Sequence, residues 1–204
     1  MTAQQPGPAV FVDKDGTLVE DIPYNVDPAR LAFKPGAPQA LAALAAQGFM
    51  IVVVTNQSGI ARGYFTRAQL AALRDALARR LAKEAGVHLA GFQFCPHAPD
   101  AWGLPTCGCR KPRPGLLLEA RWLYGIDLGR SWMVGDTLDD IEAGRRAGCR
   151  TLLYDTGGET VWRDTPLRRP LHRTADWAEV ARIVLAHAQR PAAHPSAAGG
   201  PACR

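Results

Sequence analysis

The chain has 204 residues, of which 47% are hydrophobic and 21% charged, and its formal net charge is +5. This size and composition are typical of one globular domain, and they exclude a chain that is disordered over most of its length. The longest apolar run, residues 49–54, is too short to span a bilayer. The N-terminus lacks the basic and apolar segments of a secretory signal, so we expect a cytoplasmic protein whose cysteines are thiols or metal ligands.

Short apolar runs alternate with segments of helical periodicity along the chain. The expected elements, in order, are strand 9–12, helix 38–47, strand 49–54, helix 66–85, strand 91–94, helix 114–124, strand 131–134, helix 139–147, strand 150–154 and helix 175–188. Parallel strands need crossover connections, so this alternation predicts an α/β fold with a doubly wound, mostly parallel sheet flanked by helices. We expect one domain over residues 1–188 and a disordered, Pro/Ala/Gly-rich tail over 189–204.

Polar residues follow three of the apolar strands. Asp13, Thr55 and Asp136 each come directly after one, and Asp15 lies two residues beyond Asp13. The simplest alternative is that the two aspartates belong to a turn, because Asp-Gly is a common turn dipeptide. In open α/β sheets, however, ligands bind beyond the carboxyl ends of the strands. We therefore expect Asp13, Thr55 and Asp136 to meet at one edge of the sheet.

These residue types suit the hydrolysis of a phosphate monoester. Asp13 is placed to attack phosphorus, and Asp15 to protonate the leaving oxygen and later to activate water. Asp136 adds a hard oxygen ligand, which favours Mg²⁺. Thr55 offers a hydroxyl and Lys111 a positive charge to the phosphoryl oxygens. Each residue alone is weak evidence, but their order and their positions at strand ends favour the catalytic interpretation.

The segments DKDGT, VVTNQSG, RKP and GDTLDD, in this order, resemble the four signature motifs of the haloacid dehalogenase superfamily of phosphatases. The resemblance implies a Rossmann-like core in which Asp13 is the nucleophile that forms an aspartyl-phosphate. It implies that Asp15 is the proton donor and that Thr55 and Lys111 stabilise the phosphoryl group. Mg²⁺ would then be held by Asp13, Asp136 and the backbone carbonyl of Asp15.

Three cysteines and a histidine bracket a long segment without periodicity. Cys95, His97, Cys107 and Cys109 equal the ligand set of a closed, structural Zn²⁺ site, and we expect this zinc loop over residues 95–109. The alternative is a set of small buried residues or a redox pair. A zinc ion would fix the loop just before Arg110 and Lys111, whereas Cys149, after a helix end, is expected in the core.

Too few residues separate Thr17 from Thr55 for a sizeable cap domain. Substrate would then be bound by loops of the core, and the candidates are residues 20–25, 57–63 and the zinc loop. Within the superfamily, the zinc loop resembles two groups, the D-glycero-D-manno-heptose 1,7-bisphosphate 7-phosphatases and the histidinol-phosphate phosphatases. The segment TNQSGIARGYFT resembles the first group.

That resemblance implies a set of substrate contacts, namely Asp21, Ile22, Pro23, Tyr24, Thr55, Asn56, Gln57, Ser58, Arg110 and Lys111. Arg110 suits the second phosphate of a bisphosphate, because a guanidinium binds phosphate in a bidentate manner. Two departures concern the substrate: the heptose enzymes commonly have a lysine where this chain has Thr137, and the zinc loop of this chain is rather short.

The first hypothesis is a Mg²⁺-dependent phosphatase that removes the 7-phosphate of heptose 1,7-bisphosphate, a small phosphorylated sugar, on the path to lipopolysaccharide or capsule heptose. The enzyme alternatives are a histidinol-phosphate phosphatase and a broader sugar phosphatase. The net charge also suggests a nucleic-acid-binding protein, but the arginine pairs 79–80, 145–146 and 168–169 are typical of solvated surface, and no aromatic residues are interleaved with a basic stripe. We expect a monomer without a nucleic-acid or membrane partner.

Overall fold

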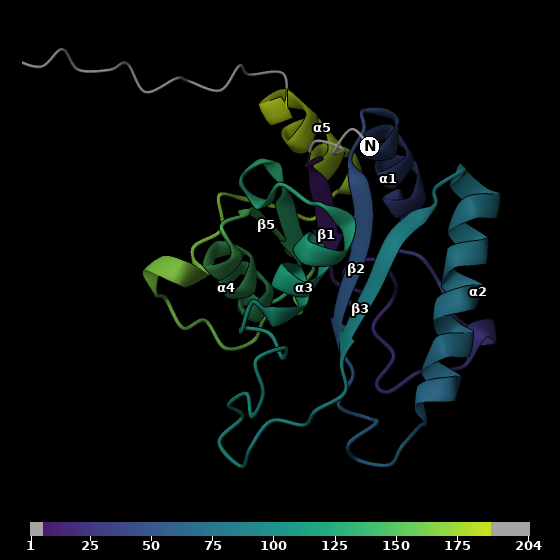
Figure 1. Ribbon diagram of the computed structural model, residues 1–204, viewed down its shortest axis with the longest axis vertical. Helices are drawn as coiled ribbons and strands as arrows, with labels where there is room; N and C mark the ends of the chain where they lie inside the picture. Colours follow the sequence, from purple (N-terminus) through teal and green to yellow (C-terminus); the bar gives the residue numbers. More distant parts are fainter. Residues whose placement is uncertain (1–5, 189–204) are drawn as a thin grey trace, which may run out of the picture.

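A six-stranded, all-parallel sheet forms the centre of the computed structural model, which describes residues 6–188 (Figure 1). The predicted tail, 189–204, lies outside the described residues. The strand order is β3-β2-β1-β4-β5-β6, and the strands are Ala9–Val12 (β1), Met50–Asn56 (β2), Leu89–Cys95 (β3), Trp132–Gly135 (β4), Arg150–Tyr154 (β5) and His172–Thr174 (β6). This arrangement confirms the predicted fold class.

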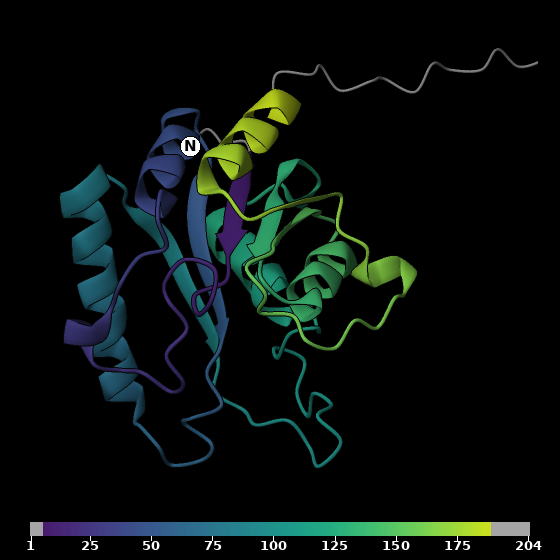
Figure 2. The same ribbon diagram turned by 180° about the vertical axis from the view of Figure 1, so that it is seen from behind.

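Helices cover both faces of the sheet, which makes three layers (Figures 1 and 2). The helices are Ala37–Ala46 (α1), Arg67–Ala85 (α2), Gly115–Tyr124 (α3), Leu138–Ala147 (α4) and Trp177–Ala188 (α5). One apolar core contains buried residues of α1, α2 and α5, and a second, on the other face, contains residues of α3 and α4. Successive side chains of β1 point to the two cores, with Val10 and Val12 in the first and Phe11 in the second. Because both faces are covered, the central strands are continuously apolar.

Local sequence signals set the bounds of the helices. Helix α2 begins after Thr66, whose hydroxyl accepts a hydrogen bond from the Gln69 backbone amide, and ends at Gly86 in a left-handed conformation. The leucine stripe of α2 is buried in the first core. The predicted elements are confirmed, with bounds displaced by one or two residues. Strand β6 was missed because its sequence, HRT, has no apolar run.

The strand order determines where a ligand can bind. Strand β1 lies between β2 and β4. After β1 the chain builds β2 and β3 on one side of it, and then crosses to the other side to build β4, β5 and β6. Such a topological switch point opens a crevice at the carboxyl edge of the sheet. Within residues 6–188 no large cap domain interrupts this core, and none of the helices is long and apolar enough to cross a membrane.

The buried stripe of α2 generates a stability prediction. Leu77 has no exposed surface and packs in the first core, so Leu77→Ala should lower the free energy of unfolding by about 2–5 kcal/mol. Leu123, which is 48% exposed on α3, is the matched control, and Leu123→Ala should have a much smaller effect. Urea unfolding of both variants measures the difference; equal losses would contradict the assignment of α2 to the core.

Candidate active site

The predicted strand-end residues meet at the carboxyl edge of the sheet, in a cleft of about 560 Å³. Asp13 directly follows β1 and Asp136 directly follows β4, and both carboxylates are buried. Thr55 lies within β2, one residue before its end, and is also buried. Because β2, β1 and β4 are neighbours and parallel, residues far apart in the chain line one cleft.

Lys111 lies at the centre of this arrangement. Its Nζ is 2.5 Å from Asp13 Oδ1 and 2.5 Å from Asp140 Oδ1, and it donates a hydrogen bond of 2.9 Å to the Val54 carbonyl. Burial alone would lower the pKa of this lysine, but the charges of Asp13 and Asp140 raise it above its usual value. Lys111 therefore stays protonated, and it fixes the Asp13 carboxylate at the cleft floor.

Asp140 is a site residue that the sequence analysis missed. It lies in the first turn of α4, is 1% exposed, and accepts hydrogen bonds from the Thr137 backbone amide and hydroxyl. The sequence does contain a carboxylate four residues after Asp136, at the end of GDTLDD, but an aspartate at this position is equally typical of a helix-capping residue. The oxygens of Asp13, Asp136 and Asp140 lie within 4.8 Å of one another, so the three could hold a cation.

The pKa values of these carboxylates reflect their crowding. Burial raises the pKa of Asp13 well above its usual value, and the charges of Asp140 and Asp136 raise it further, although Lys111 opposes them. Burial and the charge of Asp140 likewise raise the pKa of Asp136 to about 6. Such a cluster is short of positive charge, and a divalent cation would relieve the repulsion.

Asp136 is held in a narrow space between two loops. The Thr17 hydroxyl donates a hydrogen bond of 2.9 Å to Asp136 Oδ1. A Cβ added at Gly16 would come within 2.2 Å of Asp136 Oδ2, and one at Gly158 within 2.3 Å of the same atom. Only glycine leaves room for this carboxylate on either side.

Asp15 is half-buried and is oriented by Gln57. The Gln57 Nε2 donates to Asp15 Oδ2 and to the Thr55 hydroxyl, both at 2.9 Å, and Lys14 contacts the other oxygen of Asp15. Gln57 thus joins two of the predicted catalytic residues and does not itself line the cleft.

Asn56 connects β2 to the segment that carries Lys111. Its side-chain oxygen accepts from the Lys111 amide at 3.1 Å, and its side-chain nitrogen donates to the Lys111 carbonyl at 3.2 Å. These two hydrogen bonds fix the backbone of Lys111, and Asn56 also lines the cleft.

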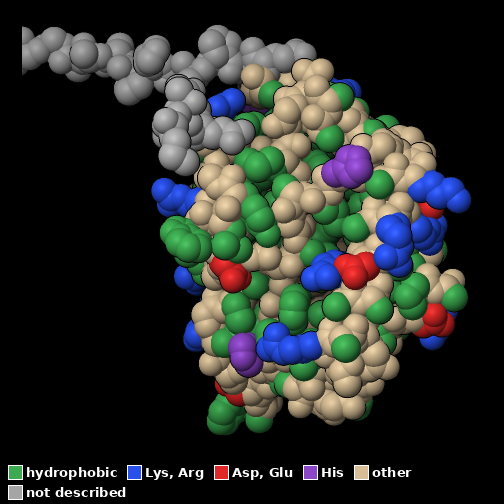
Figure 3. Space-filling view, turned by 45° about the vertical axis from the view of Figure 1, so that its right-hand side comes forward, with side chains coloured by type: hydrophobic (Ala, Val, Ile, Leu, Met, Phe, Trp, Pro, Cys, Tyr) green, Lys and Arg blue, Asp and Glu red, His purple; other side chains and the backbone are tan. Residues whose placement is uncertain are grey.

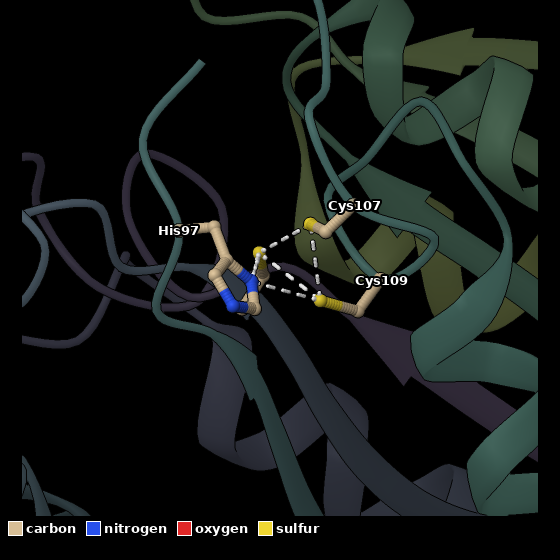
Figure 4. A group of neighbouring side chains, drawn as sticks. His97, Cys107 and Cys109 are labelled. Atoms are coloured by element: carbon tan, nitrogen blue, oxygen red, sulfur yellow. Dashed lines mark hydrogen bonds between the residues drawn. The ribbon is translucent and has the colours of Figure 1, made fainter.

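The predicted zinc ligands converge on one point beside the cleft, as the labelled residues of Figure 4 show. The sulfur atoms of Cys95, Cys107 and Cys109 are 3.3 to 3.5 Å apart, and the His97 Nδ1 is 3.6 Å from Cys95 Sγ and 3.4 Å from Cys109 Sγ. All three cysteines are free thiols, so no disulfide pair is present among them. Cys149 is buried in the core, as predicted.

The predicted substrate-contacting residues fall into two sets. Asp21, Thr55, Asn56, Arg110 and Lys111 line the cleft. Ile22, Pro23, Tyr24, Gln57 and Ser58 do not, and the ring of Tyr24 packs edge-on against Tyr64 at a centroid distance of 4.7 Å. Tyr64 directly follows the predicted loop 57–63, so this aromatic pair joins that loop to the loop 20–25.

The segment between β5 and β6 also lines the cleft, and the sequence analysis did not predict this. Residues 155–171, which we call the β5–β6 loop, contribute Gly158 to Val161, Arg163 and Arg168 to the lining. The interpretation of Arg168 as solvated surface was wrong: its side chain is 17% exposed and pairs with Asp139 and Glu142 of α4 at 2.6 and 2.7 Å. The polar sequence of this segment gave no sign of these long-range contacts.

Known proteins show the same combination of sequence and fold. The family model "HAD-hyrolase-like" matches residues 108–179. The chain is 43% identical over 157 residues to a D-glycero-beta-D-manno-heptose-1,7-bisphosphate 7-phosphatase from Yersinia pestis, covering 76% of this chain and 83% of the relative. The enzyme of the same name from Escherichia coli (strain K12) is 40% identical over 173 residues, which cover 83% and 87% of the two chains.

Two solved structures share the fold over nearly the whole chain. One is the D,D-heptose 1.7-bisphosphate phosphatase from B. bronchiseptica complexed with magnesium and phosphate, with 32% identity, a TM-score of 0.72, and 88% and 99% of the two chains covered. The other is a putative HAD-like phosphatase from Mesorhizobium loti, with 35% identity, a TM-score of 0.73, and 90% and 87% covered. The chain therefore belongs to the D-glycero-beta-D-manno-heptose-1,7-bisphosphate 7-phosphatase family of haloacid dehalogenase-like hydrolases.

Proposed function

We propose that this phosphatase removes the 7-phosphate of D-glycero-D-manno-heptose 1,7-bisphosphate, in the synthesis of heptose precursors for lipopolysaccharide or capsule. The observation that carries the proposal is the Lys111–Asp13 pair beside Asp136 on the floor of the cleft, in a chain about 40% identical to relatives of that name. The cytoplasmic location and the monomeric state expected from the sequence remain predictions.

Asp13 is the nucleophile of this mechanism. Its carboxylate oxygen attacks phosphorus, the bond between phosphorus and the sugar oxygen breaks, and an aspartyl-phosphate forms. Lys111 and the Thr55 hydroxyl stabilise the negative charge on the phosphoryl oxygens. The contact of 2.5 Å between Lys111 Nζ and Asp13 Oδ1 holds the nucleophile while leaving its second oxygen for attack.

Asp15 moves the protons. It protonates the departing sugar oxygen, and as a carboxylate it then takes a proton from the water that attacks the aspartyl-phosphate, which releases phosphate and restores Asp13. The hydrogen bond of 2.9 Å from Gln57 orients the carboxyl of Asp15, which is 29% exposed and lines the cleft. The geometry therefore suits a group that must meet both a leaving oxygen and a water molecule.

A magnesium ion fits the carboxylate cluster. Asp13, Asp136 and the backbone carbonyl of Asp15 would hold it, since hard oxygen donors are the ligands Mg²⁺ prefers. When bound, it supplies positive charge that neutralises the phosphoryl oxygens and keeps Asp13 ionised. The convergence of the Asp13 and Asp136 oxygens within 4.8 Å is the observation in its favour, and the raised pKa values of both groups agree with it.

A zinc ion fits the sulfur cluster. Tetrahedral zinc with bonds of about 2.3 Å sets its sulfur ligands roughly 3.8 Å apart, and the three sulfur atoms here are 3.3 to 3.5 Å apart, close to that spacing. Three cysteines and one histidine fill all four positions, so this ion would be structural. It would close the loop that leads into Arg110 and Lys111.

The alternatives have less support. None of the relatives named above is a histidinol-phosphate phosphatase, so nothing specific favours that substrate. On the face drawn in Figure 3, some Lys and Arg side chains gather at the right-hand edge with acidic side chains beside them, and the others are scattered among hydrophobic ones.

The substrate proposal is tested by phosphate release with Mg²⁺ from heptose 1,7-bisphosphate, histidinol phosphate and a panel of sugar phosphates. We expect preferred hydrolysis of the heptose bisphosphate at position 7. Asp13→Asn should abolish turnover while the protein stays folded, and Asp75→Asn, an exposed aspartate of α2, should keep it. Equal activity on histidinol phosphate would reject the substrate, and an active Asp13→Asn variant would reject the mechanism.

The zinc proposal predicts one zinc ion per chain in protein purified without added metal, measured by atomic emission. Cys107→Ser should lose it, since a hydroxyl is a poor zinc ligand, and should melt at a lower temperature. Cys149→Ala removes a buried thiol outside the cluster and should retain the metal. Zinc retention by Cys107→Ser equal to that of the unaltered protein would refute the site.

The cluster also predicts a pH-dependent effect of Asp136→Asn in magnesium-free buffer. Burial raises the pKa of Asp136 from 3.8 to about 6, so the ionised form destabilises the fold, increasingly as pH rises through this range. The variant should therefore be more stable than the unaltered protein at pH 8, by up to roughly 3 kcal/mol, with the difference vanishing near pH 4. Thermal unfolding at both pH values measures this; a gain at pH 4 equal to that at pH 8, or an equal gain in Asp75→Asn, would exclude ionisation of the buried Asp136 as the cause.

A further inference from the structure

The β5–β6 loop lies against the active site and is held there at several points. Near its start, Glu159 accepts hydrogen bonds of 2.7 Å from the backbone amides of Leu138, at the first turn of α4, and Val161. Near its end, Arg168 pairs with Asp139 and Glu142 of the same helix. In both ribbon views the loop passes beside α4, on the side where the zinc loop extends (Figures 1 and 2).

The close packing at Gly158 connects this loop directly to the reaction centre. The backbone there approaches Asp136 so closely that a Cβ would lie 2.3 Å from the carboxylate. Five residues later, Arg163 lines the cleft, and its backbone amide donates a hydrogen bond of 2.9 Å to the Val161 carbonyl. Arg163 is thus carried by a segment anchored to the floor of the cleft and to α4.

Two of the cationic side chains that line the cleft are available to bind a ligand. Four cationic side chains line it, namely Arg110, Lys111, Arg163 and Arg168. Lys111 pairs with Asp13 and Asp140, and Arg168 with Asp139 and Glu142. Over residues 6–188, Arg110 and Arg163 have no carboxylate partner.

These two arginines come from different walls. Arg110 belongs to the segment after the zinc ligands and Arg163 to the β5–β6 loop. Thr137, which also lines the cleft, offers no charge, and its hydroxyl donates a hydrogen bond of 2.7 Å to Asp140. A bisphosphate that places one phosphate at Asp13 still carries a dianion elsewhere, and planar guanidinium groups are suited to bind it.

We propose that Arg163 binds the phosphate that is not hydrolysed and so makes the enzyme selective for a sugar bisphosphate over the corresponding monophosphate. The inference rests on the proposed function, since it concerns the same cleft. It assigns to the β5–β6 loop a role in substrate recognition beside the loops predicted from the sequence. Arg163 touches no reacting atom, so its effect is on selectivity.

The test compares hydrolysis at position 7 of heptose 1,7-bisphosphate and of heptose 7-phosphate, and its readout is the ratio of the two kcat/KM values. Arg163→Ala should lower this ratio roughly ten-fold, the value of one charge-assisted hydrogen bond. Arg163→Lys, which keeps a charge without the planar fork, should lower it less. The matched control is Arg169→Ala in the same loop, because Arg169 pairs with Asp164 and does not line the cleft.

The outcomes separate the two proposals. A normal ratio in Arg163→Ala, or an equal fall in Arg169→Ala, would overturn the role of Arg163 and leave the proposed function standing. Failure of the unaltered protein to hydrolyse the bisphosphate would overturn the proposed function, and the role of Arg163 with it. Thermal unfolding of each variant shows whether it is folded, and because the readout is a ratio, a partial loss of folded protein does not change it.

Discussion

The buried contact of Lys111 with Asp13 and Asp140 is the interaction on which the rest of the site depends. A lysine with 2% exposure is stable only if its charge is compensated, and the carboxylates of Asp13, directly after β1, and Asp140, in α4, provide this. Removal of the lysine would leave two buried carboxylates without a compensating charge. The same contact brings together three segments that are far apart in the sequence.

Most of the surrounding structure serves to hold that lysine and its partners in place. Asn56 fixes the Lys111 backbone with two hydrogen bonds, and the cysteine–histidine cluster closes the loop just before it. Asp136 is confined by Gly16, Gly158 and Thr17, and Asp15 by Gln57. The sheet therefore determines where the catalytic side chains lie, and polar contacts from the loops determine how they are oriented, as a preorganised site requires.

The cleft above this floor is made mostly by loops. The segment after β1, the zinc loop and the β5–β6 loop contribute its walls, and the described residues contain no separate cap. A phosphatase built in this way has few charged groups with which to recognise the remote part of its substrate. The distribution of cations in the cleft therefore matters, because two of the four, Lys111 and Arg168, are already paired with carboxylates.

The sequence by itself determined the parallel α/β fold, the strand-end positions of Asp13, Thr55 and Asp136, and the grouping of Cys95, His97, Cys107 and Cys109. Those features follow from local patterns: apolar runs, helix caps, and ligands of fixed type and spacing. Only the tertiary structure revealed Asp140 as the partner of Lys111, Arg168 as a half-buried anchor, and the β5–β6 loop as a wall of the cleft. Each of these depends on contacts across many residues between polar side chains, and such contacts leave no periodic trace in the sequence.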